Sequence, residues 1–299
     1  MKRSKILVMG IAAALTLTGV STFGLPGGEG GGGGGTTVKD STIINENANV
    51  TNLAVGNSKI NSGIEAKGSE IKDSTLINEN KNVTNLAVGN SKINSGIQAN
   101  GSEIKNSTLI NENKNVTNLA VGNSKINSGI EANGSEIKNS TLINENKNVT
   151  NLAVGNSKIN SGIQANGSEI KNSTLINENK NVTNLAVGNS KINSGIQADG
   201  SEIKNSTLIN ENKNVTNLAV GNSKINSGIQ ADGSEIKNST LINENKNVTN
   251  LAVGNSKINS GIQANGAEIK NSTIINENKN TTNLAVGGSE INSGVNLGN

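Results

Sequence analysis

The amino-acid sequence predicts an all-β protein, a β-solenoid of stacked 33-residue repeats, each made of three 11-residue sub-repeats. From Ser41 onward the sequence repeats every 33 residues, and the eighth copy, which begins at Ser272, is shortened. A repeat of about 20–50 residues implies a stacked architecture. Apolar residues at the first, third and eighth positions of each 11-residue phrase do not follow a helical period. Gly and Asn fill the fourth and fifth positions, where they favour turns.

Residues 1–24 are predicted to be a secretory signal peptide. Three basic residues lie among the first five, an apolar stretch runs from Ile6 to about Val20, and we expect cleavage after Gly24. An uncleaved membrane anchor is the alternative, but an interrupted stretch of about 15 residues is short for a span. We therefore expect no membrane span after cleavage and a secreted, extracellular or cell-surface location. The pattern is typical of a bacterial protein.

Residues 25–37, LPGGEGGGGGGTT, are predicted to be a flexible Gly-rich linker, followed by a repeat domain over residues 38–299. No GK[ST] follows the glycines, so this is no phosphate-binding loop. Of the 26 basic residues, three precede the expected cleavage site, which leaves 23 against 23 acidic residues. The mature chain is close to neutral, and we expect no nucleic-acid partner. A neutral surface favours association.

The copy at 140–172 represents the repeat. The phrases that begin at Leu152 and Ile163 read as a short strand, a Gly/Asn turn and a second β segment, and we extend this pattern to the phrase from Thr174. Leu142 lies between inward positions, so it faces outward and forms an apolar line, or a local bulge tucks it in. The expected inward positions are Ile143, Val149, Leu152, Val154, Ile159, Ile163 and Ile170.

Stacked copies are expected to form polar ladders along the axis. A turn of three phrases places each residue on its own copy, and eight turns would extend about 38 Å. A turn of two phrases would mix Lys with Glu better, but it would bring Asn into the Ile column. We prefer the 33-residue turn, although it stacks like charges. The expected ladder residues are Asn144, Asn151, Asn156 and Asn160.

The composition argues against an enzyme. The chain has no His, Cys, Trp or Tyr, which removes thiolate sites, disulfides, the commonest general base and most aromatic stacking platforms. The recurring SEIK at Ser168–Lys171 and NEN at Asn144–Asn146 are expected to be surface charge and not catalytic or calcium sites. We expect no catalytic residue, no cofactor and no metal site. Disorder is the structural alternative, but the fixed apolar positions and near-neutral charge argue against it.

The first and last copies differ little from the others, and neither resembles the dedicated cap of a monomeric solenoid. Exposed strand edges at both ends would template the addition of another molecule. We therefore expect a secreted structural protein that self-assembles by edge-strand stacking into amyloid-like fibres of a biofilm or surface matrix. Its partners would be its own copies, with a secretion channel or a nucleator protein. The alternative is a monomeric β-solenoid adhesin that presents a polar face to a ligand.

The Cys-free, Asn/Gly/Ser-rich repeats over residues 41–299, behind a signal peptide and a linker, resemble those of bacterial functional amyloid subunits of the curli and Fap type. The phrase NLAVGN is loosely similar to the Val/Ala/Gly/Asn phrases of the Fap fibre subunit. The resemblance implies stacked β-arches that polymerise into biofilm fibres. It lies in the style of the repeat, since the curlin repeat is shorter and richer in Gln, so no family residue is assigned here.

Overall fold

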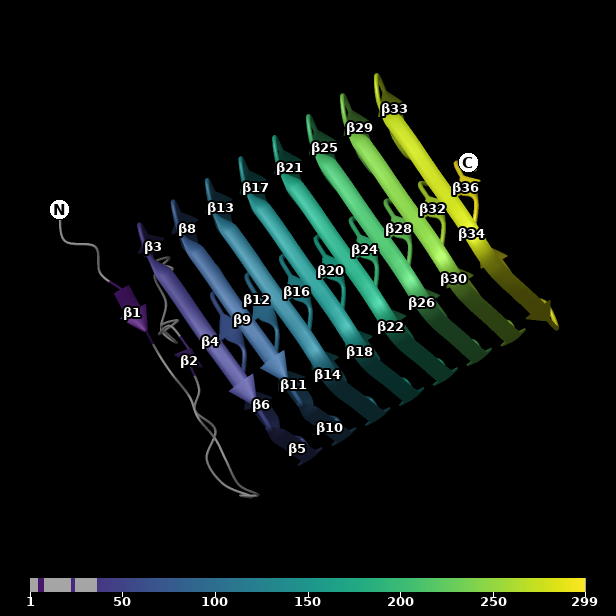
Figure 1. Cartoon of the computed structure of the whole chain (residues 1–299), viewed down its shortest axis with the longest axis horizontal. Coiled ribbons are helices and arrows are strands. Elements are labelled where there is room, and N and C mark those ends of the chain that lie inside the picture. Colours follow the sequence, from purple (N-terminus) through teal and green to yellow (C-terminus); the bar gives the residue numbers. More distant parts are fainter. Residues whose placement is uncertain (1–4, 8–22, 25–36, 299) are drawn as a thin grey trace.

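The computed structural model describes residues 5–7, 23–24 and 37–298. Within these residues it consists of β-strands and short turns, without any helix (Figure 1). The eight copies form eight turns of a β-solenoid, and the paired strand residues meet their counterparts 33 positions later. The all-β prediction and the 33-residue turn are confirmed, and the 22-residue turn is wrong.

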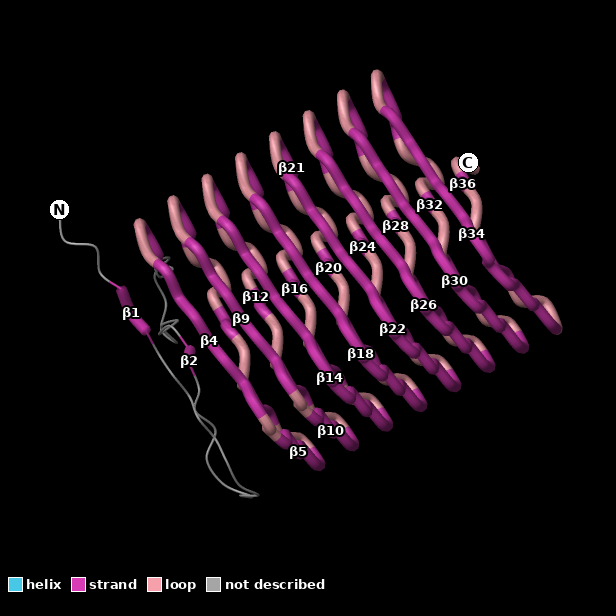
Figure 2. Tube along the Cα trace, in the orientation of Figure 1, coloured by secondary structure: helices cyan, strands magenta, loops and turns pink. Residues whose placement is uncertain are grey.

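One turn contains a long strand and a return path of three short strands (Figure 2). In the fourth copy the long strand is β18 (Thr141–Gly155). The return path is β19 (Lys158–Asn160), β20 (Ile163–Gln164) and β21 (Glu169–Lys171). All four strands pair in parallel with the turns before and after, so the molecule has four parallel sheets along its axis.

The four sheets continue these strands through all turns. The long strands are β4 (Thr42–Ala48), β5 (Thr51–Gly56), β9 (Thr75–Lys81), β10 (Thr84–Gly89), β14 (Thr108–Gly122), β18, β22 (Thr174–Gly188), β26 (Thr207–Gly221), β30 (Thr240–Gly254) and β34 (Thr273–Val286). The β19 sheet contains β6 (Lys59–Asn61), β11 (Lys92–Asn94), β15 (Lys125–Asn127), β23 (Lys191–Asn193), β27 (Lys224–Asn226), β31 (Lys257–Asn259) and β35 (Glu290–Asn292). The β20 sheet contains β7 (Ile64–Glu65), β12 (Ile97–Gln98), β16 (Ile130–Glu131), β24 (Ile196–Gln197), β28 (Ile229–Gln230), β32 (Ile262–Gln263) and β36 (Val295–Asn296). The β21 sheet contains β3 (Thr37–Lys39), β8 (Glu70–Lys72), β13 (Glu103–Lys105), β17 (Glu136–Lys138), β25 (Glu202–Lys204), β29 (Glu235–Lys237) and β33 (Glu268–Lys270).

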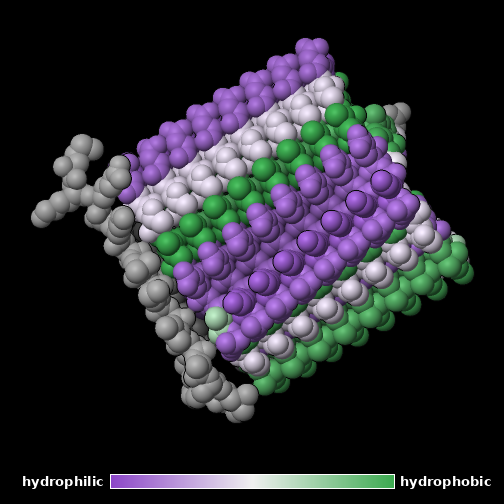
Figure 3. Space-filling view, viewed as in Figure 1, coloured by the Kyte–Doolittle hydropathy of each residue, from purple (hydrophilic) through white to green (hydrophobic). Residues whose placement is uncertain are grey.

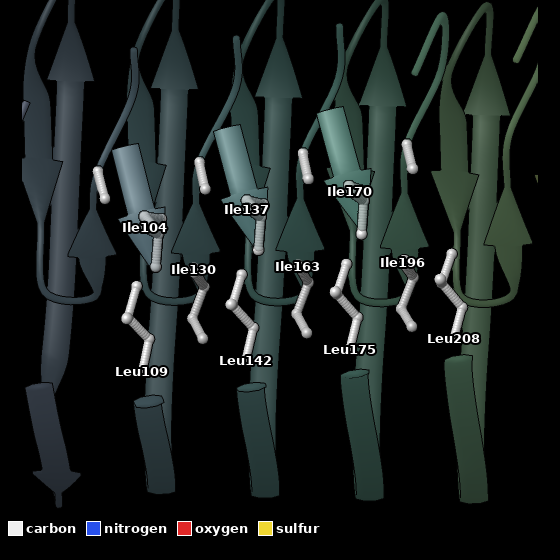
Figure 4. Packing of buried hydrophobic residues seen from close by; sticks show 14 of the residues in the cluster. Ile104, Leu109, Ile130, Ile137, Leu142, Ile163, Ile170, Leu175, Ile196 and Leu208 are labelled. Carbon is white, nitrogen blue, oxygen red and sulfur yellow. The ribbon is translucent and has the colours of Figure 1, made fainter. Parts of the chain in front are cut away.

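The apolar core lies between the first half of the long strand and the end of the return path. Leu142, Ile163 and Ile170 are fully buried and meet inside the solenoid, and the same contact recurs along the axis (Figure 4). Ile159 packs with Ala153 in a second cluster, and Val149 stacks on its own counterparts in a third. Each fully buried large side chain contributes about 1.5–3 kcal/mol, so stability comes from many stacked turns.

The long strand corrects three of the expected core positions. Ile143, Leu152 and Val154 lie on the outer face, where they are half-buried, whereas Leu142 points inward. Asn148 explains the difference, because its φ of 55° interrupts the alternation of the strand. A shift of one residue moves every following side chain to the opposite face.

The 11-residue phrases correspond only in part to the sides of a turn. The phrase from Ile163 forms β20, a turn at Gly167 and β21, as the pattern predicts. The phrase from Thr174 instead runs as continuous strand into the next phrase. The three phrases are therefore not three equal sides.

At the N-terminal end, β1 (Lys5–Leu7) pairs with β4, and β2 (Phe23–Gly24) pairs with β7. Strand β3 begins at Thr37, the last residue of the expected linker. The predicted signal peptide and linker lie mostly outside the described residues, and both stay predictions. None of the described segments is a helix long and apolar enough to cross a membrane.

Candidate functional site

Buried asparagines form hydrogen-bonded columns along the axis. Asn144 donates from Nδ2 to Oδ1 of Asn177 at 2.8 Å and to the Ser161 carbonyl at 2.6 Å. Asn146 makes the same pair of bonds, to Asn179 at 2.9 Å and to Ser161 at 2.7 Å. Because buried amides are costly when unpaired, these bonds allow polar side chains to fill the interior.

Two further columns run in opposite directions. Asn151 donates to Asn184 in the following turn at 2.8 Å, and Ser161 donates its hydroxyl to Asn151 at 2.9 Å. Asn160 donates instead to Asn127 in the preceding turn at 2.9 Å. The stack therefore has a direction along its axis. In a given column, the amide N–H faces outward at one end turn and the amide oxygen faces outward at the other.

The structure places three of the four expected ladder residues in such columns, and Asn156 is the exception. Asn156 is exposed, and its side chain makes no hydrogen bond to another described residue. Two columns were missed. Asn146 is one, and its position two residues after Asn144 in a strand could have indicated it. Asn148 is the other, on the outer face, where it donates to Asn115 at 2.9 Å.

The charges of SEIK form a zigzag along the outer surface. Lys171 pairs with Glu169 in its own turn and with Glu202 in the next at 3.4 Å. The hydrogen bond from Lys171 lowers the pKa of Glu169, and the same bond raises the pKa of Lys171. Stacking of like charges is thus offset by diagonal pairs of opposite charge, each of which stabilises little by itself.

The two end turns carry complementary groups. Asn45 in the first turn donates to Asn78, and among the described residues its Oδ1 accepts no hydrogen bond. Asn276 in the last turn accepts from Asn243 at 2.7 Å and has no following asparagine in the described residues. One end therefore offers an acceptor and the other a donor at the same position of the turn.

Apolar side chains of the outer face are uncovered at both ends. Leu53 and Val55 in the first turn are 45% and 56% exposed, and Leu284 and Val286 in the last turn are 55% and 49% exposed. Their counterparts in the inner turns are half-buried because they cover one another. Figure 3 shows such hydrophobic and hydrophilic residues as stripes parallel to the axis.

A groove of 1350 Å³ runs along the return path. Lys158 of β19 lines one side, and Gln164 of β20 lines the other. Its walls repeat in successive turns, so it is a channel along the axis and not a closed pocket. Lys67 also lines the groove, in the first turn. We call the row of lysines from β19 and its counterparts the Lys158 column, which comprises Lys59, Lys92, Lys125, Lys158, Lys191, Lys224 and Lys257.

The Lys158 column is largely free of acidic partners. Among the described residues, only Lys257 of this column forms an ion pair, with Glu290 of the last turn at 2.8 Å. Burial, followed by the charges of Lys158 and Lys224, lowers the pKa of Lys191. Within residues 5–7, 23–24 and 37–298, no group of three acidic side chains is placed to hold a metal ion.

The differences between copies concentrate at the groove. The six copies that span residues 74–271 differ at only three positions, represented by Gln164, Asn166 and Ser168. The Gln164 column lines the groove, and the Asn166 column lines it at Lys67, Asn100, Asp199 and Asp232.

No family model matches the chain, and no curated protein matches its sequence. Among solved structures it is similar to HetL, a pentapeptide repeat protein of the cyanobacterium Nostoc sp. strain PCC 7120, with 7% identity, a TM-score of 0.15, and 83% of this chain and 86% of that chain covered. It is similar to the A-module of the mannuronan C-5 epimerase AlgE6 of Azotobacter vinelandii, with 11% identity, a TM-score of 0.17, and 87% and 84% covered. It is also similar to the surface protein and adhesin PfbA of Streptococcus pneumoniae, with 11% identity, a TM-score of 0.13, and 81% and 91% covered. At these TM-scores the similarities carry no argument about function.

Proposed function

We propose that the protein is a secreted structural protein whose copies stack end to end into extracellular fibres. The observation that carries the proposal is the complementarity of the two end turns. Asn276 of one copy would donate to Asn45 of the next, as Asn243 donates to Asn276 within the chain. The junction would then continue the ladder of the internal turns.

Two substitutions at the ends remove like-charge contacts from such a junction. The Lys158 column ends at Glu290, so Glu290 would lie between Lys257 of its own chain and Lys59 of the next copy. On the outer face, Ala48 stands in the first turn where later copies have Lys, so Lys279 would face an alanine. The ends therefore favour heterologous head-to-tail contact, the type that generates filaments when it does not close.

Residues within the predicted signal peptide occupy part of the first edge. Strand β1 covers the edge of β4, and β2 covers the edge of β7. An incoming copy would use the same two edges, so stacking requires these residues to leave. Cleavage after Gly24 would therefore couple assembly to secretion.

The test is electron microscopy with fibre diffraction on the chain of residues 25–299 and on the full chain. We expect the cleaved chain to form fibres, with a meridional reflection near 4.8 Å. The full chain should form shorter fibres or remain monomeric. A cleaved chain that stays a β-rich monomer at high concentration would refute end-to-end stacking.

A monomeric cell-surface adhesin is the second candidate function. The groove along the Lys158 column favours it, because the groove is a surface that a ligand could occupy without assembly. A cleaved chain that binds cells or glycans as a stable monomer would support this candidate over the fibre.

A further inference from the structure

We propose that the groove along the Lys158 column binds a linear acidic polysaccharide, with carboxylates of successive sugars lying against successive lysines. The inference does not rest on fibre formation, because a single chain carries the whole groove. It rests on the regular spacing of cations, the absence of neutralising partners, the amides of the facing wall and the copy-to-copy variation.

The lysines form a regular row of positive charge. Lys125, Lys158 and Lys191 occupy the same position in consecutive parallel strands, β15, β19 and β23. Neighbouring strands lie about 4.8 Å apart, so the row offers one ammonium group at each such step. A polymer with one carboxylate on each sugar has charges at a similar step along an extended chain. A small anion would use only one or two of these positions.

The Lys158 column differs in its ion pairing from the Glu169–Lys171 zigzag. Lys171 has a carboxylate partner in its own turn and another in the next turn. Across the described residues, no acidic side chain lies within ion-pair distance of Lys125, Lys158 or Lys191. Like charges stacked in this way destabilise the free protein, and a bound polyanion would relieve the repulsion.

In the first and last turns, carboxylates that line the groove pair with lysines, Glu65 with Lys67 and Glu290 with Lys257, whereas in the inner turns they are held by amides. Glu131 accepts a hydrogen bond from Gln98 at 2.8 Å, and Asp199 accepts one from Gln197 at 2.8 Å. The facing wall is therefore a network of amide and carboxylate groups, of the kind that binds sugar hydroxyls.

The variation between copies falls on this wall. The Gln164 column contains Glu at Glu65 and Glu131, and the Asn166 column contains Asp at Asp199 and Asp232. The Lys158 column is constant from Lys59 to Lys257. A constant row of charge with a variable facing wall is the arrangement expected when one wall binds a repeated charge and the other adjusts the fit.

A single-stranded nucleic acid is the competing polyanion. Such strands are bound in basic grooves that also offer aromatic side chains on which the bases stack. The sole aromatic residue of the chain is Phe23, in the predicted signal peptide. The groove therefore suits a polymer that is recognised by charge and hydroxyl groups.

The test is titration of the purified protein, at a concentration where it is monomeric, with polygalacturonate, neutral dextran and single-stranded DNA of similar length. We expect binding to polygalacturonate that weakens with salt, little binding to dextran, and weaker binding to the DNA. The variant K125Q/K158Q/K191Q should lose at least tenfold in affinity. The matched variant K114Q/K147Q/K180Q has the same change of charge on the long-strand face, and it should change affinity less than twofold.

Two further variants keep the proposal falsifiable if the triple glutamine variant folds poorly. Q98E/Q164E places in the groove the residue that Glu131 already provides, so the fold should tolerate it, and we expect weaker binding. K125R/K158R/K191R keeps the charge and should keep the binding. Equal losses in the groove and long-strand variants, equal binding of dextran, tighter binding of DNA, or no binding at all would overturn the proposal. These outcomes can be interpreted even if the protein forms no fibres, because the titrations use the monomer.

Discussion

At the scale of single residues, Asn148 determines which side chains of the long strand enter the core. Its φ of 55° lies in the left-handed region, and it is the one residue of β18 without a pairing partner in the register of the sheet. Before it, Leu142 and Asn144 point inward, and after it Val149 and Asn151 do so. Asn tolerates this conformation better than other non-glycine residues because its short polar side chain bonds locally.

Substitution of Asn148 tests this role. Asn148→Val should lower the free energy of unfolding by about 1–2 kcal/mol, because a β-branched residue is disfavoured at positive φ. Asn148→Gly should cost less, although it removes the exposed hydrogen bond to Asn115. Urea unfolding followed by circular dichroism measures both. Thr150→Val on the same outer face is the control, and equal losses for Asn148→Val and Asn148→Gly would contradict the backbone explanation.

At the scale of strands and sheets, the sequence predicts the return path well and the long strand poorly. Ile159, Ile163 and Ile170 each lie in a short segment between Gly/Asn turns. Each is the large apolar residue of its segment, so the sequence identifies the side chain that faces the core, and the structure buries all three. In the long strand both Leu142 and Ile143 are apolar, so composition does not distinguish the inner face. Whether Leu142 or Ile143 faces inward depends on the left-handed backbone at Asn148, further along the strand. The two-residue alternation of a strand does not reveal that interruption.

The groove was also beyond sequence reasoning. Lys158 has the same local pattern as any surface lysine, and its groove exists only because the chain bends between β19 and β20. The Glu169–Lys171 zigzag likewise depends on contacts between turns, which stack Glu169 on Glu202 while placing Lys171 between them. Both features depend on distances between neighbouring turns and between strands of one turn, and the linear sequence does not contain these distances.

The zigzag predicts how stability responds to acid. The pKa of Glu169 is lowered by its hydrogen bond to Lys171, and that of Glu202 by its bond to Lys204. A lowered pKa in the folded state stabilises the protein above the unfolded pKa of about 4.3, and the contribution is lost as the pH falls through the folded value. Burial raises the pKa of Glu145, so protonation of Glu145 at low pH stabilises the folded state instead of destabilising it.

We therefore expect the variant E169Q/E202Q/E235Q to lose less thermal stability than the natural sequence when the pH falls from 7 to 3. Its melting temperature at pH 7 should be lower, because the three carboxylates no longer pair with lysines. Glu145→Gln should instead raise the melting temperature at pH 7. Melting curves by circular dichroism measure these values, and parallel pH profiles for the triple variant and the natural sequence would exclude a contribution from the zigzag.

At the scale of the whole molecule, the stack is directional, so its two ends differ. The Asn144 column donates toward the C-terminal end, whereas the Asn160 column donates toward the N-terminal end. Two identical ends could not satisfy both columns, whereas head-to-tail contact satisfies both at once. The proposed filament thus follows from the same hydrogen bonds that hold neighbouring turns together.

The charge at the proposed junction gives the sharpest test of this directionality. Glu290→Lys should slow fibre growth at least tenfold at low salt, because it places lysine against Lys59 of the next copy and extends the like-charge column. Lys59→Glu alone should also slow growth, since it opposes Glu290. The double variant restores an opposite pair at the junction, so its growth rate should recover.

Thioflavin fluorescence and electron microscopy of seeded reactions measure these growth rates. The salt dependence is part of the expectation, because screening at about 1 M ionic strength reduces the Debye length to about 3 Å and should bring the single variants closer to the natural sequence. Glu290→Lys also removes the ion pair with Lys257 within the chain, so its melting temperature must be compared with that of the double variant, which lacks the same ion pair. If the double variant recovers the growth rate but not the melting temperature, the effect lies at the junction between copies. If the double variant grows as slowly as the single variants, a contact between Glu290 and Lys59 is excluded.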